Sequence, residues 1–246
     1  MQNLNICLRS WGKQNSLRTL TYICYLKETL GQAFKLNFFI ATDIEKPIIL
    51  PDTQDLNIIY TNMHSFSKSL NKIISMLPAD SPTLTLSIGV KIKLEHILNA
   101  LSWIKLENIY SYGWQIEGLN NNGIAPGRGW YNTAALFSEK FTELLKNRPL
   151  PDYIDNKKEG YLTVNNKPIP IGGNEEIIMM YYAINYDQMA YFVLNTKDIL
   201  SYNFQEATDI NFEEKLLRKE KVANYYIDKK LSVQKEDLWQ HLILIK

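Results

Sequence analysis

The sequence of 246 residues is long enough to bury a full hydrophobic core, and 46% hydrophobic and 12% aromatic residues exclude a disordered chain. Its 27 basic and 26 acidic residues give a formal net charge of +1, which excludes the strongly basic balance of a dedicated nucleic-acid-binding protein. We therefore expect a globular protein with no nucleic-acid partner.

The cysteines and the apolar segments indicate the cellular compartment in which we expect the protein. Cys7 falls in a predicted strand and Cys24 in a predicted helix, so we interpret both as core thiols rather than as a disulfide or zinc ligands. The N-terminus lacks the pattern of a signal peptide, and no apolar run approaches the length of a membrane span. These features predict a cytoplasmic protein.

The first half of the chain alternates strands and helices. The sequence predicts strands at residues 4–8, 36–41, 56–60, 83–86 and 108–114, and the run 36–41 is nearly continuously apolar, as in strands buried on both faces of a parallel sheet. Apolar residues at helical spacing predict helices at residues 17–30, 65–77 and 94–104. This alternation is typical of an α/β fold with a mostly parallel sheet flanked by helices.

The second half of the chain departs from this regular alternation of strands and helices. Residues 117–130 hold four glycines and three consecutive asparagines, which indicates a long candidate binding loop. Later patterns predict a short strand running into a helix at 133–145, a hairpin or extended arm at 161–171, a buried helix at 175–185, a strand at 190–194 and a charged helix at 211–228. The simplest division is one domain at 1–204 with a C-terminal helical extension at 205–246 packed on it.

The apolar stretch 238–245 has three candidate roles. It could pack on the core, form the interface of a homo-oligomer or lie at a membrane surface as a peripheral contact. Packing on the core is favoured, because eight residues anchor poorly in a membrane.

Polar residues follow three of the predicted strands, and ligands of open parallel sheets bind outside the carboxyl ends of the strands. Arg9 and Ser10 follow the first strand, Asp43 ends the second, and the segment from Ser87 to Gly89 follows the fourth. The Asp43 carboxylate could accept hydrogen bonds from a base or ribose, or it could end an ordinary turn.

Cations near glycines are candidates for binding a pyrophosphate. Arg9, Lys13 and Arg128 lie in or beside glycine-containing loops, although any one of them alone reads as a solvated charge. In Gly127-Arg128-Gly129-Trp130 an aromatic ring stands next to an arginine, which suits a sugar ring or a phosphate.

Several familiar motifs are missing from the sequence. It contains no GxxxxGK[ST], GxGxxG, CxxC or GxSxG segment, which disfavours a P-loop NTPase, a dinucleotide dehydrogenase, a zinc module and an α/β hydrolase. The three histidines are scattered without ligand spacing, which disfavours a histidine metal site.

The acidic start of the predicted helix 175–185 is the candidate for a general base. Gly172 and Gly173 loosen the backbone, Asn174 can cap the helix, and Glu175 and Glu176 occupy its first turn. A carboxylate at a glycine hinge can act as a general base, but acidic residues in a first turn also complement the helix dipole. Both interpretations stay open on these residues alone.

The order of these features resembles a glycosyltransferase of the GT-A fold, closest to the inverting enzymes of glycosyltransferase family 2. The resemblance rests on the apolar strand that ends in an acidic residue at 38–43, on the segment 132–141, and on the glycine-rich acidic segment 172–176 that opens a helix. It extends over roughly residues 4–204 and implies a GT-A-like, nucleotide-binding sheet.

The resemblance implies transfer of a sugar from a nucleotide-sugar donor to a glycan or lipid-linked acceptor, with inversion, as in polysaccharide biosynthesis. It implies that Glu176, or else Glu175, deprotonates the acceptor hydroxyl, and that Asp43 contacts the base. The other implied contacts are Arg9, Ser10, Ser87, Gly89 and Arg128 on the donor side, and Trp130, Tyr131, Gly172, Gly173 and Asn174 on the acceptor side.

One departure from the family concerns the metal. The family's DxD motif after the fourth strand holds a divalent cation on the donor diphosphate, and oxygen ligands suit Mg²⁺ or Mn²⁺. Ser87 and Gly89 stand at the carboxylate positions here, so we assign no metal ligand. A metal-independent enzyme could use Arg9, Lys13 or Arg128 to neutralise the leaving diphosphate. Alternatively, Asp80 or another carboxylate could hold Mn²⁺ or Mg²⁺, or the chain could be a non-catalytic GT-A-like binding or assembly subunit.

Overall fold

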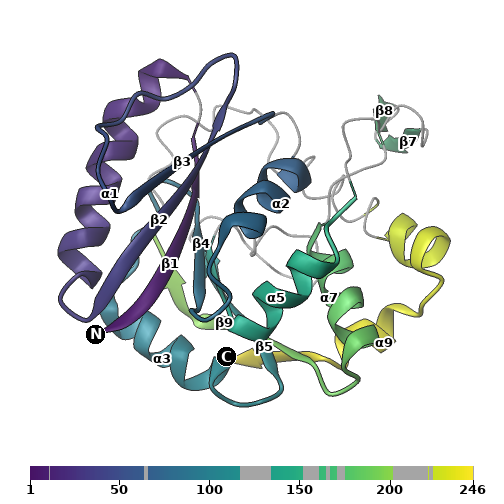
Figure 1. Ribbon diagram of the computed structural model, residues 1–246. Helices are drawn as coiled ribbons and strands as arrows, with labels where there is room; N and C mark the ends of the chain where they lie inside the picture. The colour runs from purple at the N-terminus through teal and green to yellow at the C-terminus, as the bar shows by residue number, and fades with distance from the viewer. Residues whose placement is uncertain are drawn as a thin grey trace.

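The computed structural model describes residues 1–10, 12–63, 66–116, 134–151, 161–164, 167–170, 175–201, 221 and 224–245 (Figure 1). Its strands are β1 (Gln2–Arg9), β2 (Phe34–Asp43), β3 (Leu56–Thr61), β4 (Thr83–Leu86), β5 (Ile109–Ile116), β6 (Ala134–Phe137), β7 (Tyr161–Val164), β8 (Lys167–Pro170), β9 (Tyr191–Leu200) and β10 (Leu242–Ile245). Its α-helices are α1 (Ser16–Leu30), α2 (Phe66–Met76), α3 (Leu94–Ile104), α5 (Glu139–Asn147), α7 (Glu175–Tyr186) and α9 (Lys235–Trp239). A short 3₁₀ helix, η1 (Lys13–Asn15), precedes α1, and a π-helix, η3 (Tyr226–Leu231), precedes α9.

Eight of these strands form one sheet, in the order β10-β9-β5-β6-β4-β1-β2-β3. β6 runs antiparallel to its neighbours β4 and β5, and the other strand pairs of this sheet are parallel. β7 and β8 form a separate antiparallel hairpin. The structure thus confirms the α/β class and the mostly parallel sheet, and of the two alternatives at 161–171 it shows the hairpin rather than the extended arm.

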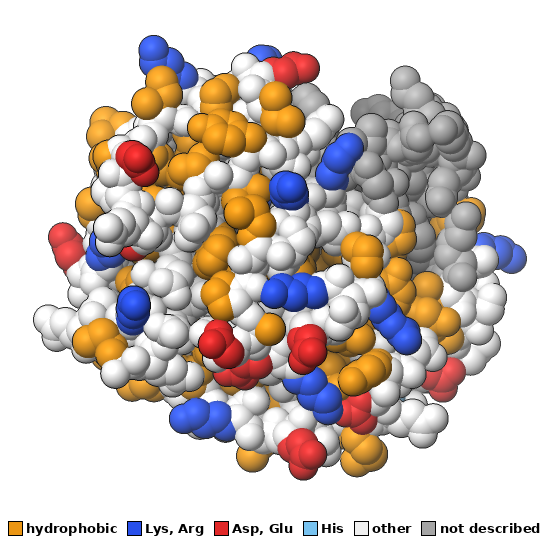
Figure 2. All heavy atoms as spheres, in the orientation of Figure 1, with side chains coloured by type: hydrophobic (Ala, Val, Ile, Leu, Met, Phe, Trp, Pro, Cys, Tyr) orange, Lys and Arg blue, Asp and Glu red, His pale blue; other side chains and the backbone are white. Residues whose placement is uncertain are grey.

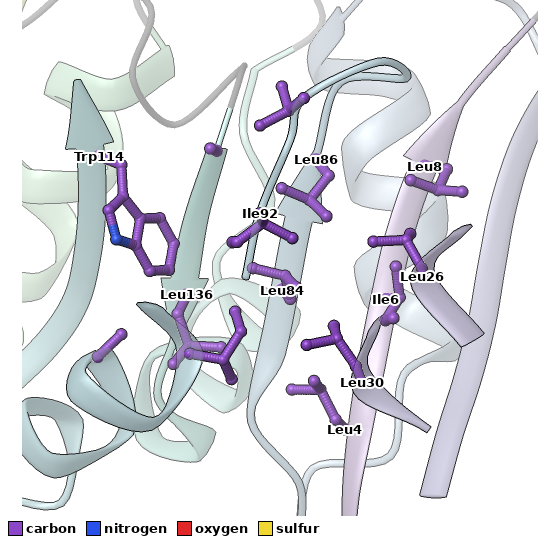
Figure 3. Close-up of a cluster of buried hydrophobic side chains, with 14 of the residues drawn as sticks. Leu4, Ile6, Leu8, Leu26, Leu30, Leu84, Leu86, Ile92, Trp114 and Leu136 are labelled. Atoms are coloured by element: carbon purple, nitrogen blue, oxygen red, sulfur yellow. The ribbon is translucent and has the colours of Figure 1, made fainter. Parts of the chain in front are cut away.

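Helices cover both faces of the sheet (Figure 1). α1 and α3 pack on one face, where Leu4 and Leu8 of β1 share a buried cluster with Leu26 of α1 (Figure 3). α2, α5 and α7 pack on the opposite face, in a second cluster that includes Cys7 of β1 and Phe39 of β2. Successive residues of β1 therefore enter two different cores, which explains why the strand is apolar without alternation.

α7 is buried, as its apolar sequence predicts. Ile177, Ile178, Met179, Met180 and Ala183 are all buried. They lie in the clusters that α7 shares with α5 and with α9. The glycine-rich approach and the acidic first turn therefore lead into a helix that is fixed on several sides.

The exposure of Cys24 contradicts the prediction that both cysteines are core thiols. Cys7 is a buried thiol, and its burial raises its pKa, but Cys24 is exposed. The inward face of α1 is formed by Tyr22, Ile23 and Leu26, among others, and the helical period turns position 24 towards solvent. Only one of the two cysteines is thus a core thiol.

The C-terminal part of the chain enters the main sheet. β10 pairs in parallel with β9, from Leu242 opposite Phe192 to Ile245 opposite Asn195. The stretch 238–245 thus packs on the core, and it adds a strand that the expected helical extension did not include. The boundary at 204 stays a prediction, because residues 202–220 lie outside the described residues. Within the described residues, no helix is both long and apolar enough to cross a membrane.

Candidate functional site

Three strands end side by side at the carboxyl edge, the edge of the sheet where the parallel strands finish. The register places Arg9 of β1 opposite Ala41 of β2. The pairing of β1 with β4 sets Ser87, the first residue after β4, level with Arg9. The structure therefore brings Arg9, Ser10, Asp43 and the segment beginning at Ser87 to one edge, as the strand-end rule predicts.

Asp43 ends β2 with a carboxylate that is held by backbone amides. Its Oδ1 accepts hydrogen bonds from the N–H of Glu45 at 2.9 Å and of Lys46 at 3.1 Å, and its Oδ2 accepts one from Met63 at 3.1 Å. The side chain is buried, with 8% of the residue exposed. These three bonds tie the loop after β2 to the segment after β3, so the position of the carboxylate is fixed.

Ser10 is engaged within the chain. Its Oγ lies 2.8 Å from Thr19 Oγ1, and the Thr19 hydroxyl donates to the Asn15 carbonyl at 2.8 Å. Since the Thr19 proton is used, Ser10 is the donor of their mutual bond. This bond fixes the start of α1 against the end of β1, and the predicted contact of Ser10 with a nucleotide sugar stays a prediction.

Arg9 extends towards α2. Its Nη1 donates to Ser69 Oγ at 3.4 Å, across the face that α2 covers. The positive charge of Arg9 therefore lies beside α2, at the carboxyl edge, two strand positions from the end of β2. This is a suitable place for a cation that faces a diphosphate, although that role stays a prediction.

The segment after β4 is a tight turn pinned by α1. The Val90 N–H donates to the Ser87 carbonyl at 3.2 Å, and Gly89, the third residue of this turn, has φ 105°. A positive φ at the third position of a β-turn favours glycine, because a side chain would be strained there. The Tyr22 hydroxyl donates to the Val90 carbonyl at 2.7 Å, so α1 holds the turn in place.

The residues of this turn do not fit a divalent cation. Ser87 and Gly89 supply no carboxylate, whereas Mg²⁺ and Mn²⁺ sites are built largely from charged oxygen ligands. Among the described residues no cluster of three or more His, Cys, Asp or Glu side chains could hold a metal ion. The divalent cation of the resembled family therefore has no matching ligand set among the residues that the structure describes.

Asp80 does not supply the missing ligand, which corrects one of the alternatives. It lies before β4, where its Oδ1 accepts a hydrogen bond from Ser81 Oγ at 3.1 Å. The four residues of β4 alone span about 13 Å. Asp80 and Ser87 therefore sit at opposite edges of the sheet.

The first turn of α7 begins at the carboxyl edge. α7 leads directly into β9, which runs parallel to β5, so the helix has to start at the carboxyl edge and end at the amino edge. The backbone of Glu175 and Glu176 forms this first turn. Six predicted site residues lie outside the described residues: Arg128, Trp130, Tyr131, Gly172, Gly173 and Asn174. The side chains of Glu175 and Glu176 also lie outside them. Their roles stay predictions.

A groove that the sequence analysis missed lies beside the Asp43 turn. It has a volume of about 740 Å³ and is lined by Ile44, Tyr60, Thr61, Asn62, Lys68, Asn71, Lys72, Ser75, Leu145, Lys146 and Pro149. The signal in the sequence was the spacing of Lys68, Lys72 and Ser75 along one face of α2. That spacing reads as an ordinary solvated helix face until the end of β3 and the end of α5 are placed next to it.

Comparisons with known proteins identify the fold. No protein-family model matches the sequence, and no curated protein matches it. Among solved structures, a mannosyltransferase from Pyrobaculum calidifontis in complex with GDP-Man and Mn²⁺ has a TM-score of 0.54 at 8% identity, over 93% of this chain and 70% of that one.

Two further solved structures are similar. Glucosyl-3-phosphoglycerate synthase from Mycobacterium tuberculosis, in complex with Mn²⁺, UDP and phosphoglyceric acid, has a TM-score of 0.50 at 9% identity, over 89% of this chain and 78% of that one. S. aureus TarS 1-349 in complex with UDP-GlcNAc has a TM-score of 0.50 at 12% identity, over 98% of this chain and 71% of that one. At these identities the likeness shows the fold alone. The chain therefore has the GT-A fold of these glycosyltransferases, as the resemblance predicted.

Proposed function

We propose that this protein is a glycosyltransferase that moves a sugar from a nucleotide-sugar donor to a hydroxyl of a glycan or lipid-linked acceptor, with inversion, in polysaccharide biosynthesis. The observation that supports it most is the carboxyl edge. There a GT-A sheet gathers a buried carboxylate, a cation, a fixed turn and the acidic first turn of a buried helix. Two of the similar solved structures, from Pyrobaculum calidifontis and S. aureus, hold GDP-Man and UDP-GlcNAc respectively.

On the donor side, Asp43 contacts the base and Arg9 faces the diphosphate. A carboxylate accepts hydrogen bonds but donates none, so it suits the N–H groups of a base or the hydroxyls of a ribose. This role is supported by the three backbone amides that hold the Asp43 carboxylate in a fixed position at the end of β2. Arg128 joins Arg9 in this proposal as a second cation.

On the acceptor side, Glu176 or Glu175 takes the proton of the attacking hydroxyl. The acceptor oxygen forms a bond to the anomeric carbon from the face opposite the leaving group. The bond from that carbon to the diphosphate oxygen breaks, and its electron pair leaves with the diphosphate. One attack from the far side inverts the anomeric carbon. The arginines stabilise the charge that develops on the diphosphate, and no step runs through a metal.

The experiment has two stages. Calorimetry with UDP-, GDP- and CMP-sugars identifies a donor, and mass spectrometry of acceptor mixtures then detects transfer. Glu175→Gln and Glu176→Gln should both stay folded and differ sharply in turnover, because only one carboxylate can be in hydrogen-bond reach of the hydroxyl. Equal, wild-type rates in both variants would reject the assignment of the base.

A second function is favoured by one observation, the absence of carboxylates in the turn after β4. In that case the protein is a non-catalytic binding or assembly subunit with a GT-A fold. Failure of every tested nucleotide sugar to bind would favour this function. Binding followed by transfer would exclude it.

A further inference from the structure

The groove along α2 has a positive lining. Lys68, Lys72 and Lys146 line it, and none of the described residues that line it is an Asp or Glu. The whole chain is nearly neutral, at +1, so these three charges are concentrated locally. Figure 2 looks onto this face and shows Lys and Arg side chains over α2, with a group of acidic side chains below them. Such a concentration of one sign attracts anions.

The charges are spaced for separate anionic groups. Lys68 and Lys72 are exposed and lie four residues apart on one face of α2, so they are about 6 Å apart along the helix axis. Lys146 is half-buried, and its Nζ donates to the Leu77 carbonyl just after α2. The ammonium of Lys146 is thus anchored in the wall of the groove.

The walls of the groove are held together. Asn71 of α2 donates to the Leu150 carbonyl at 2.7 Å and accepts from the Leu150 N–H at 2.9 Å. This pair of bonds joins α2 to the segment that follows α5. A groove with fixed walls loses little conformational freedom when a ligand binds.

The groove lies next to both parts of the proposed site. Its lining includes Ile44, the residue after Asp43, and Thr61 at the end of β3. It also includes Leu145 of α5 and Pro149, which follows α5, and α5 packs on α7. A chain lying in the groove would therefore contact both the neighbourhood of the Asp43 turn and a helix that packs on α7.

We propose that this groove binds the non-reacting part of an acceptor glycan that carries several anionic groups, phosphates or carboxylates, along its length. This inference rests on the proposed glycosyltransferase function, and it names the class of acceptor. Lys68 and Lys72 each bind one anionic group, and Lys146 binds a third. The open shape and the mixed polar and apolar lining suit an extended sugar chain better than a small compact ligand.

The test is binding of defined probes by calorimetry at two salt concentrations. The probes are an oligogalacturonate, which carries carboxylates, inorganic tripolyphosphate, which carries phosphates, and a neutral malto-oligosaccharide. The variant Lys68→Gln/Lys72→Gln should weaken binding of an anionic probe about tenfold and reduce its salt dependence. The matched control, Lys35→Gln/Lys105→Gln, removes the same charge from exposed sites outside the groove and should bind like the wild type.

The outcomes separate the proposals. Binding of only one anionic probe supports the groove and identifies its charged group as phosphate or carboxylate. Equal binding of the neutral probe, equal losses in the two double variants, or displacement of the probe by the nucleotide diphosphate would overturn the groove proposal. Anionic probe binding that depends on Lys68 and Lys72, in a protein that binds no nucleotide sugar, would retain the groove and reject the glycosyltransferase. Donor binding and sugar transfer without binding of an anionic probe would retain the glycosyltransferase function and reject the groove proposal.

Discussion

The turns after β2 and β4 lie at the same edge of the sheet, but they are built differently. The first contains a buried carboxylate, Asp43, whose oxygens accept three backbone N–H groups. The second contains no charge and a glycine with φ 105°, and a tyrosine of α1 fixes it. In one turn the side chain organises the backbone, and in the other the surrounding helix does.

This difference indicates what each turn can bind. A fixed carboxylate suits a polar, uncharged partner that donates hydrogen bonds, such as a base or ribose. A turn of Ser87, Ile88 and Gly89 presents backbone and one hydroxyl, which cannot neutralise a cation. In the proposed reaction the diphosphate therefore has to be balanced by arginine and lysine side chains.

The largest expected effect concerns the carboxylate of the first turn. Asp43→Ala leaves three amides without their acceptor in a buried place, and we expect a loss of roughly 3 kcal/mol in the free energy of unfolding. Urea denaturation measures it. Asp43→Asn should lose less, because its carbonyl oxygen can still accept. The control Asp80→Ala, at an exposed carboxylate, should stay within about 0.5 kcal/mol of wild type. Equal losses at both aspartates would contradict the contrast between the turns.

A smaller effect is expected at the glycine of the second turn. Gly89→Ala forces a side chain into a positive φ, and we expect a loss of about 1–2 kcal/mol in the free energy of unfolding. Gly89→Asn should lose less, since asparagine tolerates positive φ better than alanine. An alanine variant as stable as the wild type would show that the turn does not need glycine.

Asp187, at the amino edge of the sheet, is a carboxylate held mainly by side chains. It serves as a comparison with Asp43, which backbone amides hold. Lys140 Nζ lies 2.6 Å from its Oδ2 and the Tyr110 hydroxyl donates to it at 3.2 Å, and the bond from Lys140 lowers the Asp187 pKa. A lowered pKa contributes stability above the unfolded value near 4, and this stability is lost as the pH falls through the folded pKa.

Asp187→Asn should therefore cost roughly 0.5–1 kcal/mol at neutral pH, a modest value because Lys140 is partly exposed. The free energies of unfolding of variant and wild type should converge when the pH is lowered from about 6 to about 3. Denaturation at several pH values measures this. Lys140→Gln should behave similarly, and a difference that does not change with pH would argue against an ion pair.

The smallest expected effect is that of metal removal on the affinity for a nucleotide sugar. Because neither turn offers a fitting ligand set, EDTA should leave the affinity for a nucleotide sugar unchanged within experimental error. Calorimetry with and without EDTA checks this. Loss of binding that Mn²⁺ restores would place a metal site in a part of the chain that the structure does not describe.

Much of the fold was predictable because local patterns encode it. Apolar runs identified the strands of the first half, since a parallel sheet buries both faces of each strand. The helix expected from residue 175 begins at Glu175. The antiparallel direction of β6 was not predictable, because the apolar pattern of Ala134–Phe137 is the same in either direction. The exposure of Cys24 was not predictable either, because it depends on which face of α1 packs on the sheet.

The site was less predictable than the fold. The strand-end rule placed Asp43 and Ser87 at the same edge of the sheet, on the strands that flank β1, because register follows from the parallel sheet. It did not reveal that the Ser10 hydroxyl donates to Thr19, which requires the packing of α1. The groove was missed because Lys68 and Lys146 are far apart in the sequence and meet only when α2 and α5 pack together.

The pairing of β10 with β9 has a consequence for how the protein is made. Residues 242–245 are synthesised after β9 and after the segment that separates them from it, yet they form the strand beside β9. Until then, the hydrogen-bonding groups of β9 that face β10 have no strand beside them, and such unpaired strands promote association between nascent chains. β9 is therefore paired on this side only after residue 245 has been synthesised, and a chain truncated before residue 242 should aggregate although its proposed catalytic residues are all present.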